Sequence, residues 1–283
     1  MPAKLEGREN EPDGPANGLE AFALELKAQR EAAGLTQEQL AKLMGYSASV
    51  IAKLETCRTV PSPQHADRAD EALKMPGTFR RLRKATINGT YEPWFQAFID
   101  IETRATVLRW WEPLVIPGLL QTEPYARGVL RGARPTDSDA AIEQLVAARM
   151  SRQVIWEREV PLPPVLSVIL AQGVLSQRVG NAQVMREQLG RLIEAAQSPR
   201  ITIQIMPSSA DAHPGLLGPF VVASFENSPD AAYLDNALDG QVTERRAQVA
   251  QVSLLYDTLR SEAVSPGAST DLIMKVADET WRT

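Results

Sequence analysis

The sequence of 283 residues predicts an α+β protein, in which a small all-α domain precedes a larger domain of mixed helices and strands. Three observations support this prediction. Apolar residues recur at helical spacing in short stretches between residues 19 and 73, whereas strand-like patterns begin only after residue 164. Between them, Met75-Pro76-Gly77 and Asn88-Gly89-Thr90 are turn-forming sequences that indicate a linker. With 44% hydrophobic residues, the chain has enough apolar material to fold around a core.

The predicted boundaries divide the chain into four parts. Residues 1–18 combine Pro, Gly, Asn and charged residues with almost nothing apolar, so we expect a disordered tail there. Residues 19–75 form the helical domain, residues 76–90 a basic linker, and residues 91–283 the α+β domain. The linker is basic because four cationic side chains cluster in it: Arg80, Arg81, Arg83 and Lys84.

Four short helices are expected in the helical domain. Gly34 and Gly45 stop the first and second helices, and Thr36 and Ser47 are suitable N-cap residues for the second and third. Pro61-Ser62-Pro63 breaks the chain before the fourth. The predicted helices cover residues 21–33, 37–44, 48–55 and a segment that ends near residue 73.

The larger domain is predicted to alternate helices with short strands. One apolar face defines a first helix over residues 93–110, through Trp94, Phe98, Ile101, Ala105 and Leu108. Further helices are expected near residue 125 and over residues 137–159, 181–197, 243–261 and 270–280. β-Branched residues and alternation predict strands over residues 165–170, 201–205, 220–225 and 231–235.

The distribution of charge is uneven along the chain. The formal net charge is −5 at neutral pH, which argues against nonspecific coating of nucleic acid. Residues 19–84, however, contain eleven cationic and eight anionic side chains. This excess is a weak indication of nucleic-acid binding near the N-terminus, and a solvated helix face explains it equally well.

Several classes of protein are not expected. No apolar run approaches the ~18–20 residues that cross a bilayer, and residues 1–18 lack the apolar segment of a secretory signal. Cys57 is the single cysteine, and His65 and His213 are the two histidines, which disfavours a disulfide framework or a Cys- or His-rich metal site. We therefore expect a cytoplasmic protein with no metal and no cofactor.

An enzyme is not expected either. The chain contains no phosphate-binding loop, no dinucleotide-binding glycine motif, no nucleophile elbow and no H-E-x-x-H zinc motif. His213 lies in the Pro/Gly loop SADAHPGLLG and is a candidate general base or ligand, and Trp110-Trp111 is a candidate pocket lining, although buried aromatics are usually core residues. A loop histidine of this kind is more often a surface or hydrogen-bonded residue, so we assign no catalytic residue.

Residues 26–62 have the pattern of two helices that cross at a steep angle. The crossing needs a small residue in the first helix, here Ala41, and a tight turn, here at Gly45. The apolar residues that lock the pair are Leu40, Met44, Val50, Ile51 and Leu54. This arrangement turns the start of the second helix outward, where its N–H groups and dipole suit a phosphate or a groove.

These residues resemble the helix-turn-helix of phage Cro/repressor-like, Xre-type DNA-binding domains. The resemblance covers Arg30, the string GLTQEQLA, a Gly-x-Ser turn, IxxLE and an Arg-x-x-Pro-Ser tail. It implies that Gln37 binds a phosphate, that Arg58 approaches the DNA backbone, and that four residues face the bases: Ser47, Ala48, Ser49 and Lys53. It also implies a structural ion pair between Arg30 and Glu55.

Two features depart from the Xre-type pattern. The family usually has glycine after the third helix, where this chain has Thr56-Cys57. A positive φ at that exit costs a residue with a Cβ atom about 1 kcal/mol. The base-facing residues are also short, so we expect sequence readout to depend on Lys53, water and DNA shape.

Residues 91–283 resemble the large C-terminal domain that follows such modules in many actinomycete regulators. The shared motifs occur in the same order in this chain: Trp94-Phe95 with Glu102, residues 116–122 (IPGLLQT), Tyr125-Ala126-Arg127, Arg149 with Arg152-Gln153, residues 185–192, residues 201–207 and Gly218-Pro219-Phe220. The resemblance implies an antitoxin-like protein whose gene lies beside that of a small partner protein.

The leading hypothesis is a sequence-specific transcriptional regulator, homodimeric and nucleoid-associated, whose C-terminal domain binds a partner protein or a small ligand. The alternative is an antitoxin-like protein that chiefly neutralises a small partner, with DNA binding as autoregulation. A third hypothesis, an enzyme with a helix-turn-helix head, requires a convergent polar pocket in residues 91–283.

Overall fold

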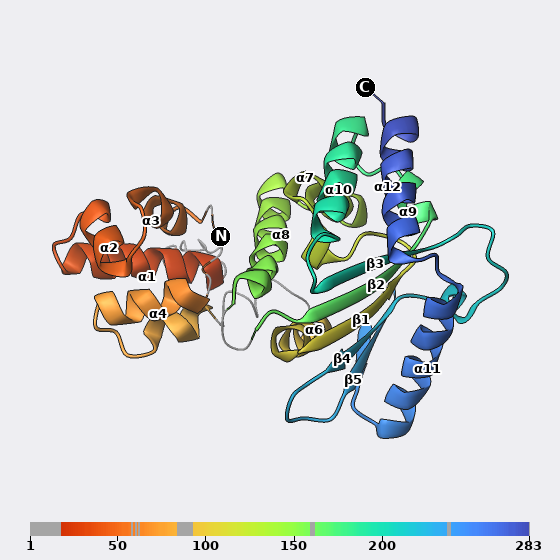
Figure 1. The fold of residues 1–283 in the computed structure, drawn as a ribbon. Helices are drawn as coiled ribbons and strands as arrows, with labels where there is room; N and C mark the ends of the chain where they lie inside the picture. The colour runs from red at the N-terminus through yellow and green to blue at the C-terminus, as the bar shows by residue number, and fades with distance from the viewer. Residues whose placement is uncertain are drawn as a thin grey trace, which may run out of the picture. The chain divides into compact units, whose positions relative to one another are not determined.

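The computed structural model describes residues 18–57, 59, 61, 63–83, 93–158, 162–236 and 239–282. The chain separates into two compact units, Met1–Thr90 and Tyr91–Thr283, and each has its own hydrophobic core. The predicted tail lies outside the described residues except for Gly18. The predicted α+β class is confirmed, with a helical N-terminal unit and a C-terminal unit that contains the sheet (Figure 1).

The N-terminal unit is a bundle of short helices. They are α1 (Gly18–Ala32), α2 (Gln37–Met44), α3 (Ala48–Glu55), α4 (Pro63–Ala72) and a last helical segment over residues 78–83. Apolar residues from all of them form one core, which includes Phe22, Leu26, Leu40, Met44, Ile51, Leu54 and Ala66. α2 begins with a capping box, in which Thr36 and Gln39 bond each other's backbone N–H groups, and it ends at Gly45 in the left-handed conformation.

The helical unit extends beyond the boundary predicted at residue 75. Phe79 is fully buried and packs edge-to-face against Phe22, with 5.3 Å between the ring centroids. Its backbone N–H donates to Asp70 Oδ1 at 2.9 Å. Residues 78–83, which were assigned to the linker, therefore belong to the helical unit, because the core needs Phe79 to close it. Of the remaining residues of the predicted linker, Pro76 and Gly77 precede this segment, and residues 84–90 lie outside the described residues.

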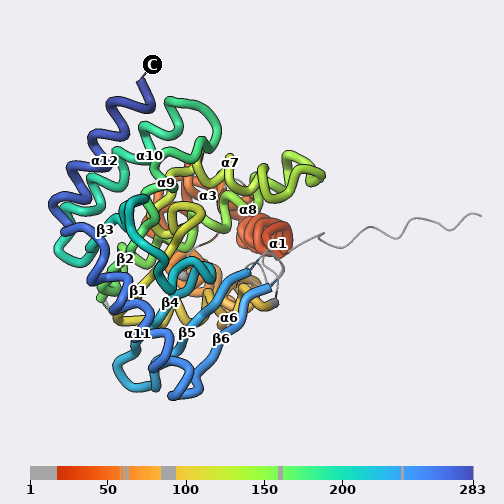
Figure 2. The backbone as a smooth tube through the Cα atoms, turned by 90° about the vertical axis from the view of Figure 1, so that its right-hand side faces the viewer, coloured from red at the N-terminus to blue at the C-terminus, as the bar shows by residue number. Residues whose placement is uncertain are grey.

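The C-terminal unit is built on a six-stranded mixed sheet with the order β3-β2-β1-β4-β5-β6. The strands are β1 (Val107–Glu112), β2 (Val165–Ala171), β3 (Ile201–Met206), β4 (Phe220–Ser224), β5 (Ala231–Asp235) and β6 (Gly240–Thr243). β1, β2 and β3 are parallel, whereas β4, β5 and β6 join the sheet through antiparallel pairs. β3 and β6 therefore form the two edges, as Figure 2 shows.

Helices cover both faces of this sheet. One face packs against a core to which α6 (Pro93–Arg104), α7 (Glu123–Ala133), α9 (Gly173–Ser176), α10 (Ala182–Ala195) and α12 (Pro266–Thr280) contribute. α10 and α12 run side by side (Figures 1 and 2). α11 (Arg246–Glu262) covers the other face, with a separate core around Trp111 and Tyr256. α8 (Asp139–Ser151) packs against α7.

Two predicted elements of the C-terminal unit were wrong in part. The helix predicted over residues 93–110 ends at Arg104, and residues 107–112 form β1, which pairs with both β2 and β4. Leu108 is buried as predicted, but from a strand. The helix predicted over residues 137–159 ends at Ser151 and continues as a 3₁₀ segment, Arg152–Glu157. β6 was not predicted.

The described helices include none that is long and apolar enough to cross a membrane. Within the same described residues, no group of three or more His, Cys, Asp or Glu side chains is placed to hold a metal ion.

Candidate nucleic-acid interface

α2 and α3 form a compact pair joined by a connection of three residues, Gly45 to Ser47. Ala41, 2% exposed, lies inside α2, and its small side chain allows α3 to cross closely. Gly45 adopts φ 75°, and the N–H of Tyr46 donates to the Ala41 carbonyl at 2.8 Å. These bonds satisfy the last carbonyls of α2 and direct the chain into α3. The connection therefore fixes the direction of the helix that was predicted to face DNA.

The predicted ion pair between Arg30 and Glu55 is present and connects α1 with α3. Arg30 Nε donates to Glu55 Oε1 at 2.6 Å, and Arg30 Nη2 donates to Glu55 Oε2 at 3.0 Å. Arg30 Nη1 also donates to the Leu35 carbonyl at 2.9 Å. The two side chains are only 10% and 3% exposed. The hydrogen bond from Arg30 to Glu55 raises the pKa of the Arg30 guanidinium, so this side chain stays cationic although it is buried.

Gln37, predicted to bind a phosphate, joins this pair. Its Nε2 donates to Glu55 Oε2 at 2.8 Å, and the side chain is half-buried at the first position of α2. One N–H of the amide is therefore used inside the domain, while the other donor and the amide oxygen are not. The sequence contained no signal for this third member of the network, because the contact depends on the side-chain rotamers of Gln37 and Glu55.

The first turn of α3 presents short polar side chains. Ser47 and Ser49 are exposed, as is Lys53 in the next turn, and Ala48 is half-buried. Ser47 has the extended backbone of an N-cap, but its hydroxyl makes no capping bond, contrary to the prediction that Ser47 caps this helix. The hydroxyl and the first N–H groups of α3 therefore remain available to an external acceptor. Arg58, the remaining predicted contact, lies outside the described residues.

The exit from α3 has the geometry that normally favours glycine. Cys57 adopts φ 57°, in the left-handed region, and Thr56 Oγ1 donates to the Ala52 carbonyl at 2.6 Å. The chain thus makes the turn with a residue that has a Cβ atom, and retains the associated strain. Burial raises the pKa of the Cys57 thiol, so the thiol is not activated as a nucleophile.

Three members of the basic cluster predicted in the linker, Arg80, Arg81 and Arg83, have partners within the helical unit, and the fourth, Lys84, lies outside the described residues. Arg80 Nε lies 2.7 Å from Asp67 Oδ1, and Arg81 Nη2 donates to the Thr78 hydroxyl at 3.1 Å. Arg83 Nε donates to the Pro61 carbonyl at 3.1 Å. The arginines of this cluster therefore stabilise the last helical segment, and their charge alone is weak evidence for DNA contact.

Several motif residues of the C-terminal unit meet on one face of the sheet. Glu102 and Arg152 form a buried ion pair, with Nη2–Oε2 and Nε–Oε1 distances of 2.5 and 2.8 Å. Both side chains are almost inaccessible, at 2% and 6% exposed. The guanidinium also lies over the rings of Phe95 and Phe98, 5.1 and 5.6 Å from their centroids.

Neighbouring motif residues hold the segment that follows β1. Gln153 Nε2 donates to the carbonyls of Gly118 and Gln121 at 2.9 and 2.7 Å. Arg149 Nη1 donates to Gln121 Oε1 at 3.2 Å, and the Tyr125 hydroxyl accepts the Ile116 N–H at 3.3 Å. All these bonds end on main-chain groups or on neighbouring motif side chains, so the arrangement supports the fold of residues 116–122.

Two titratable groups of this unit, Glu112 and His213, lie close to the end of β1. Glu112 is 7% exposed, and burial raises its pKa to about 7 although the backbone N–H groups of Leu114 and Val115 donate to it. His213 packs edge-to-face on Trp111, with 5.5 Å between ring centroids, in the loop that Trp111 Nε1 anchors by donating to the Gly215 carbonyl at 2.9 Å.

Two family profiles match the chain. One, described as a helix-turn-helix domain, matches residues 21–83, and so includes the last helical segment of the N-terminal unit. A domain of this kind is typical of DNA-binding regulators. The other, described as a domain of unknown function (DUF5753), matches residues 95–275. No curated protein matches the chain, and no solved structure does. Because the second match covers more than half of the sequence, the chain belongs to the DUF5753 family, with a helix-turn-helix domain at its N-terminus.

Proposed function

We propose that the protein is a sequence-specific, Xre-type transcriptional regulator that inserts the start of α3 into the major groove of DNA. The observation that carries this proposal is the uncapped first turn of α3, held on a buried frame. Ser47 makes no capping bond, and the Arg30–Glu55–Gln37 network ties the three helices behind that turn. A rigid frame supports direct readout because base contacts depend on precise placement of the helix.

The residue roles follow from position. Gln37 and Arg58 bind the DNA backbone, whereas Ser47, Ala48, Ser49 and Lys53 face the bases. Gln37 suits its role because Glu55 holds one of its amide N–H groups and leaves the second to a phosphate. Lys53 is the one long cationic side chain of α3, so it is the residue on which base discrimination depends most.

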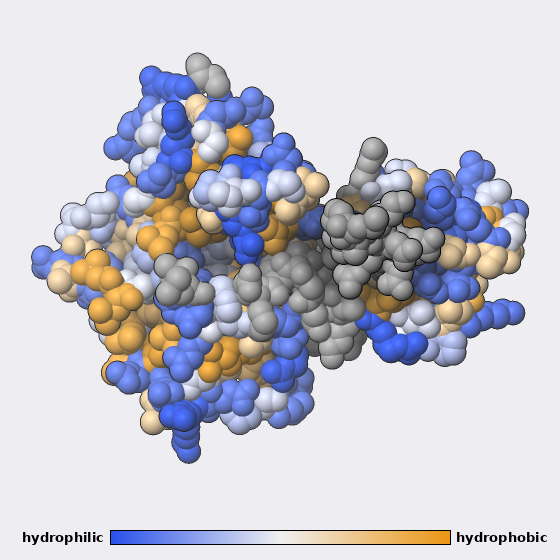
Figure 3. Space-filling view, turned by 180° about the vertical axis from the view of Figure 1, so that it is seen from behind, coloured by the Kyte–Doolittle hydropathy of each residue, from blue (hydrophilic) through white to orange (hydrophobic). Residues whose placement is uncertain are grey.

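The protein acts as a homodimer in this proposal. One α3 with mostly short side chains makes few base contacts, and two copies on half-sites about 34 Å apart double them. The exposed apolar residues of the C-terminal unit favour a contact there: Leu216 and Leu217 are 70% and 91% exposed. Apolar patches are visible on this unit in Figure 3, where the described part of the helical unit is mainly hydrophilic.

In this proposal the C-terminal domain binds a partner protein or a small ligand. The protein acts by binding rather than by catalysis. It is located in the cytoplasm, associated with the nucleoid. An antitoxin-like role, in which neutralisation of a small partner is the main task, is the second candidate. It rests on the resemblance of the motif residues in the C-terminal unit.

The test is selection of genomic DNA fragments by the purified full-length protein, followed by gel shifts on the selected site. Gln37→Ala is expected to weaken binding to all sites alike, and Lys53→Ala to change the preferred sequence as well. Lys27→Ala, on the exposed side of α1, is the matched charge control. Full-strength, unaltered binding by the Gln37→Ala, Lys53→Ala double variant would refute the assignment, and light scattering of the free and DNA-bound protein tests the dimer.

A further inference from the structure

β3 has one side without a strand partner, and part of that side is covered by the chain itself. The carbonyls of Arg200 and Met206 accept hydrogen bonds from N–H groups on the β2 side. The even-numbered residues of β3 therefore face β2, and the odd-numbered residues direct their N–H and C=O groups outward. At Ile205 both outward groups are satisfied, since the N–H donates to Ser269 Oγ and the carbonyl accepts the Val264 N–H, each at 2.9 Å.

Ile203 points its main-chain groups in the same direction, but they are not paired. Among the described residues, neither its N–H nor its C=O has a hydrogen-bond partner, and the same is true of the Ile201 carbonyl. Ile203 is only 2% exposed, so bulk water reaches these groups poorly. Buried main-chain donors and acceptors without partners are rare, because each costs roughly a lost hydrogen bond.

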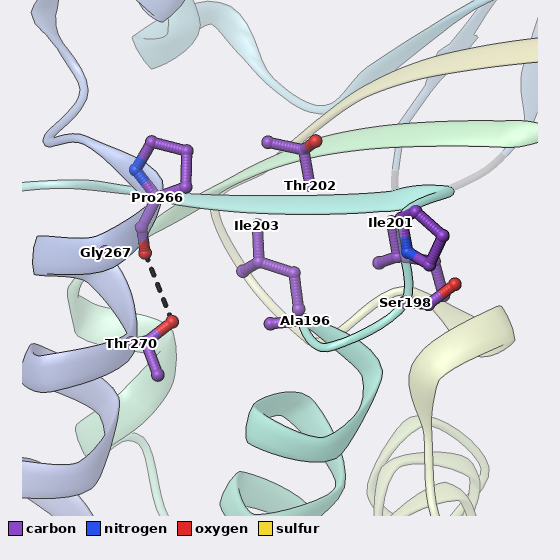
Figure 4. Close-up of a pocket in the computed structure, with 9 residues that line it drawn as sticks. Ala196, Ser198, Ile201, Thr202, Ile203, Pro266, Gly267 and Thr270 are labelled. Carbon is purple, nitrogen blue, oxygen red and sulfur yellow. Dashed lines mark hydrogen bonds between the residues drawn. The ribbon is translucent and has the colours of Figure 1, made fainter.

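A groove lies against this part of β3. Its volume is about 340 Å³, and it is lined by the end of α10, by Ile201, Thr202 and Ile203, and by the start of α12. Figure 4 shows Thr202 and Ile203 on opposite sides of the strand, with Pro266 and Thr270 on the facing helix. The Thr270 hydroxyl is already used, since it donates to the Pro266 carbonyl at 3.1 Å. No lining residue carries a charge.

We infer that this groove binds an extended peptide segment of a partner protein, which adds to the free side of β3 as a short strand. Such a segment supplies a carbonyl for the Ile203 N–H and two N–H groups for the carbonyls of Ile201 and Ile203. These groups span about 7 Å of strand, so two or three residues of the peptide make the main-chain contacts. Because the walls are uncharged, the side chains that enter the groove are small or apolar.

This inference rests on the partner-binding role proposed for the C-terminal domain. It assigns that role to the groove beside β3 and to an extended peptide as the ligand. A small organic ligand is less suited, since the groove offers main-chain groups in strand spacing and no charged side chain. Ordered water also satisfies buried main-chain groups, so bound water is the alternative from which the experiment distinguishes a peptide.

The probe is a library of random linear seven-residue peptides displayed on phage and selected on the full-length protein. Selected peptides are synthesised, and their dissociation constants measured by fluorescence polarisation for wild type and Gly267→Phe. A Cβ atom added at Gly267, which lines the groove near the start of α12, meets no atom within 4 Å, so the backbone there accepts a side chain that extends into the groove. Gly190→Phe is the matched control, because Gly190 is equally unobstructed on the exposed surface of α10 and does not line the groove.

We expect Gly267→Phe to weaken binding by about tenfold or more and Gly190→Phe to leave it unchanged. Two further measurements test for main-chain pairing. N-methylation of the peptide should abolish binding when the methyl group is at every second position, and should be tolerated at the positions between them. Bound peptide should also slow hydrogen exchange at the Ile203 amide. Failure to select any binding peptide, or equal binding by Gly267→Phe, would overturn the proposal in favour of bound water. A natural partner that binds wild type and Gly267→Phe equally would overturn the assignment of this site. The partner-binding role proposed for the C-terminal domain would remain intact.

Discussion

Replacement of Arg30 by alanine tests whether the buried ion pair holds the helical unit together. The substitution removes both hydrogen bonds from Arg30 to Glu55 and the bond to the Leu35 carbonyl. Glu55, whose side chain is 3% exposed, then keeps a buried negative charge with Gln37 as its remaining hydrogen-bond donor. The substitution therefore leaves a buried charge uncompensated, which costs more than the removal of a surface contact.

The expected cost follows from that burial. Removal of one partner from a buried pair destabilises by about 3–5 kcal/mol, whereas exposed pairs contribute less than about 1 kcal/mol. Domains have total stabilities of about 5–15 kcal/mol, so Arg30→Ala should bring this small unit close to its unfolding transition at room temperature. The Arg30→Met, Glu55→Met double variant should recover most of the loss, since it leaves no buried charge unpaired.

The measurement is urea unfolding of residues 1–90, a compact unit with its own core, followed by far-ultraviolet circular dichroism. Tryptophan fluorescence does not report on this unit, because all five tryptophans lie at or after residue 94. A decrease below about 1 kcal/mol for Arg30→Ala would refute the reasoning, as would a double variant less stable than the single one.

Three further substitutions test other features. Cys57→Gly should raise the thermal midpoint of residues 1–90, because φ 57° costs a residue with a Cβ atom about 1 kcal/mol. Burial raises the pKa of Glu112 from 4.5 to about 7, so its stabilising contribution is complete below pH 4.5 and is lost as the pH rises through 7. The free energy of unfolding, measured with urea, should therefore decrease by up to about 3 kcal/mol between pH 5 and pH 8. Glu112→Gln should remove most of this decrease. Gly215→Ala should cost about 1–3 kcal/mol in fluorescence-detected unfolding, because its Cβ atom would lie 2.5 Å from the buried Trp111 ring.

Each of the three has a matched control. Thr56→Gly, at φ −107°, should destabilise rather than stabilise. Glu226→Gln, on the exposed surface, should leave the pH dependence unchanged. Gly173→Ala should be tolerated, because its Cβ atom meets nothing within 4 Å. Equal effects of a test variant and its control would contradict the corresponding explanation.

The elements that were predicted correctly are those whose ends are set by local chemistry. α2 begins after Thr36 and ends at Gly45 as expected, because a capping box and a left-handed glycine act within a few residues. β1 was missed for the opposite reason. Its sequence VLRWWE fits a helical face as well as a strand, and only its pairing with β2 and β4, far along the chain, decides between them.

The sequence predicted the residues of the candidate DNA interface, but it did not predict the full hydrogen-bond network that holds them. The resemblance to Xre-type domains implied the Arg30–Glu55 pair, and the structure contains it. The resemblance does not reveal that Gln37 bonds the same carboxylate, because that contact depends on side-chain rotamers. Ser47 shows the same limit, for its backbone is that of an N-cap while its hydroxyl makes no capping bond.

The open part of β3 depends on features that no local pattern contains. Its sequence ITIQIM alternates like any half-buried strand, and nothing in it distinguishes a central strand from an edge strand. The strand order leaves one side of β3 unpaired, and Ser269, 64 residues after Ile205, closes only the end of that side. The start of α12 thus decides how much of the edge stays open. A partner that pairs with Ile203 must therefore reach β3 beside the end of α10 and the start of α12, where the Ile203 main-chain groups have no hydrogen-bond partner among the described residues.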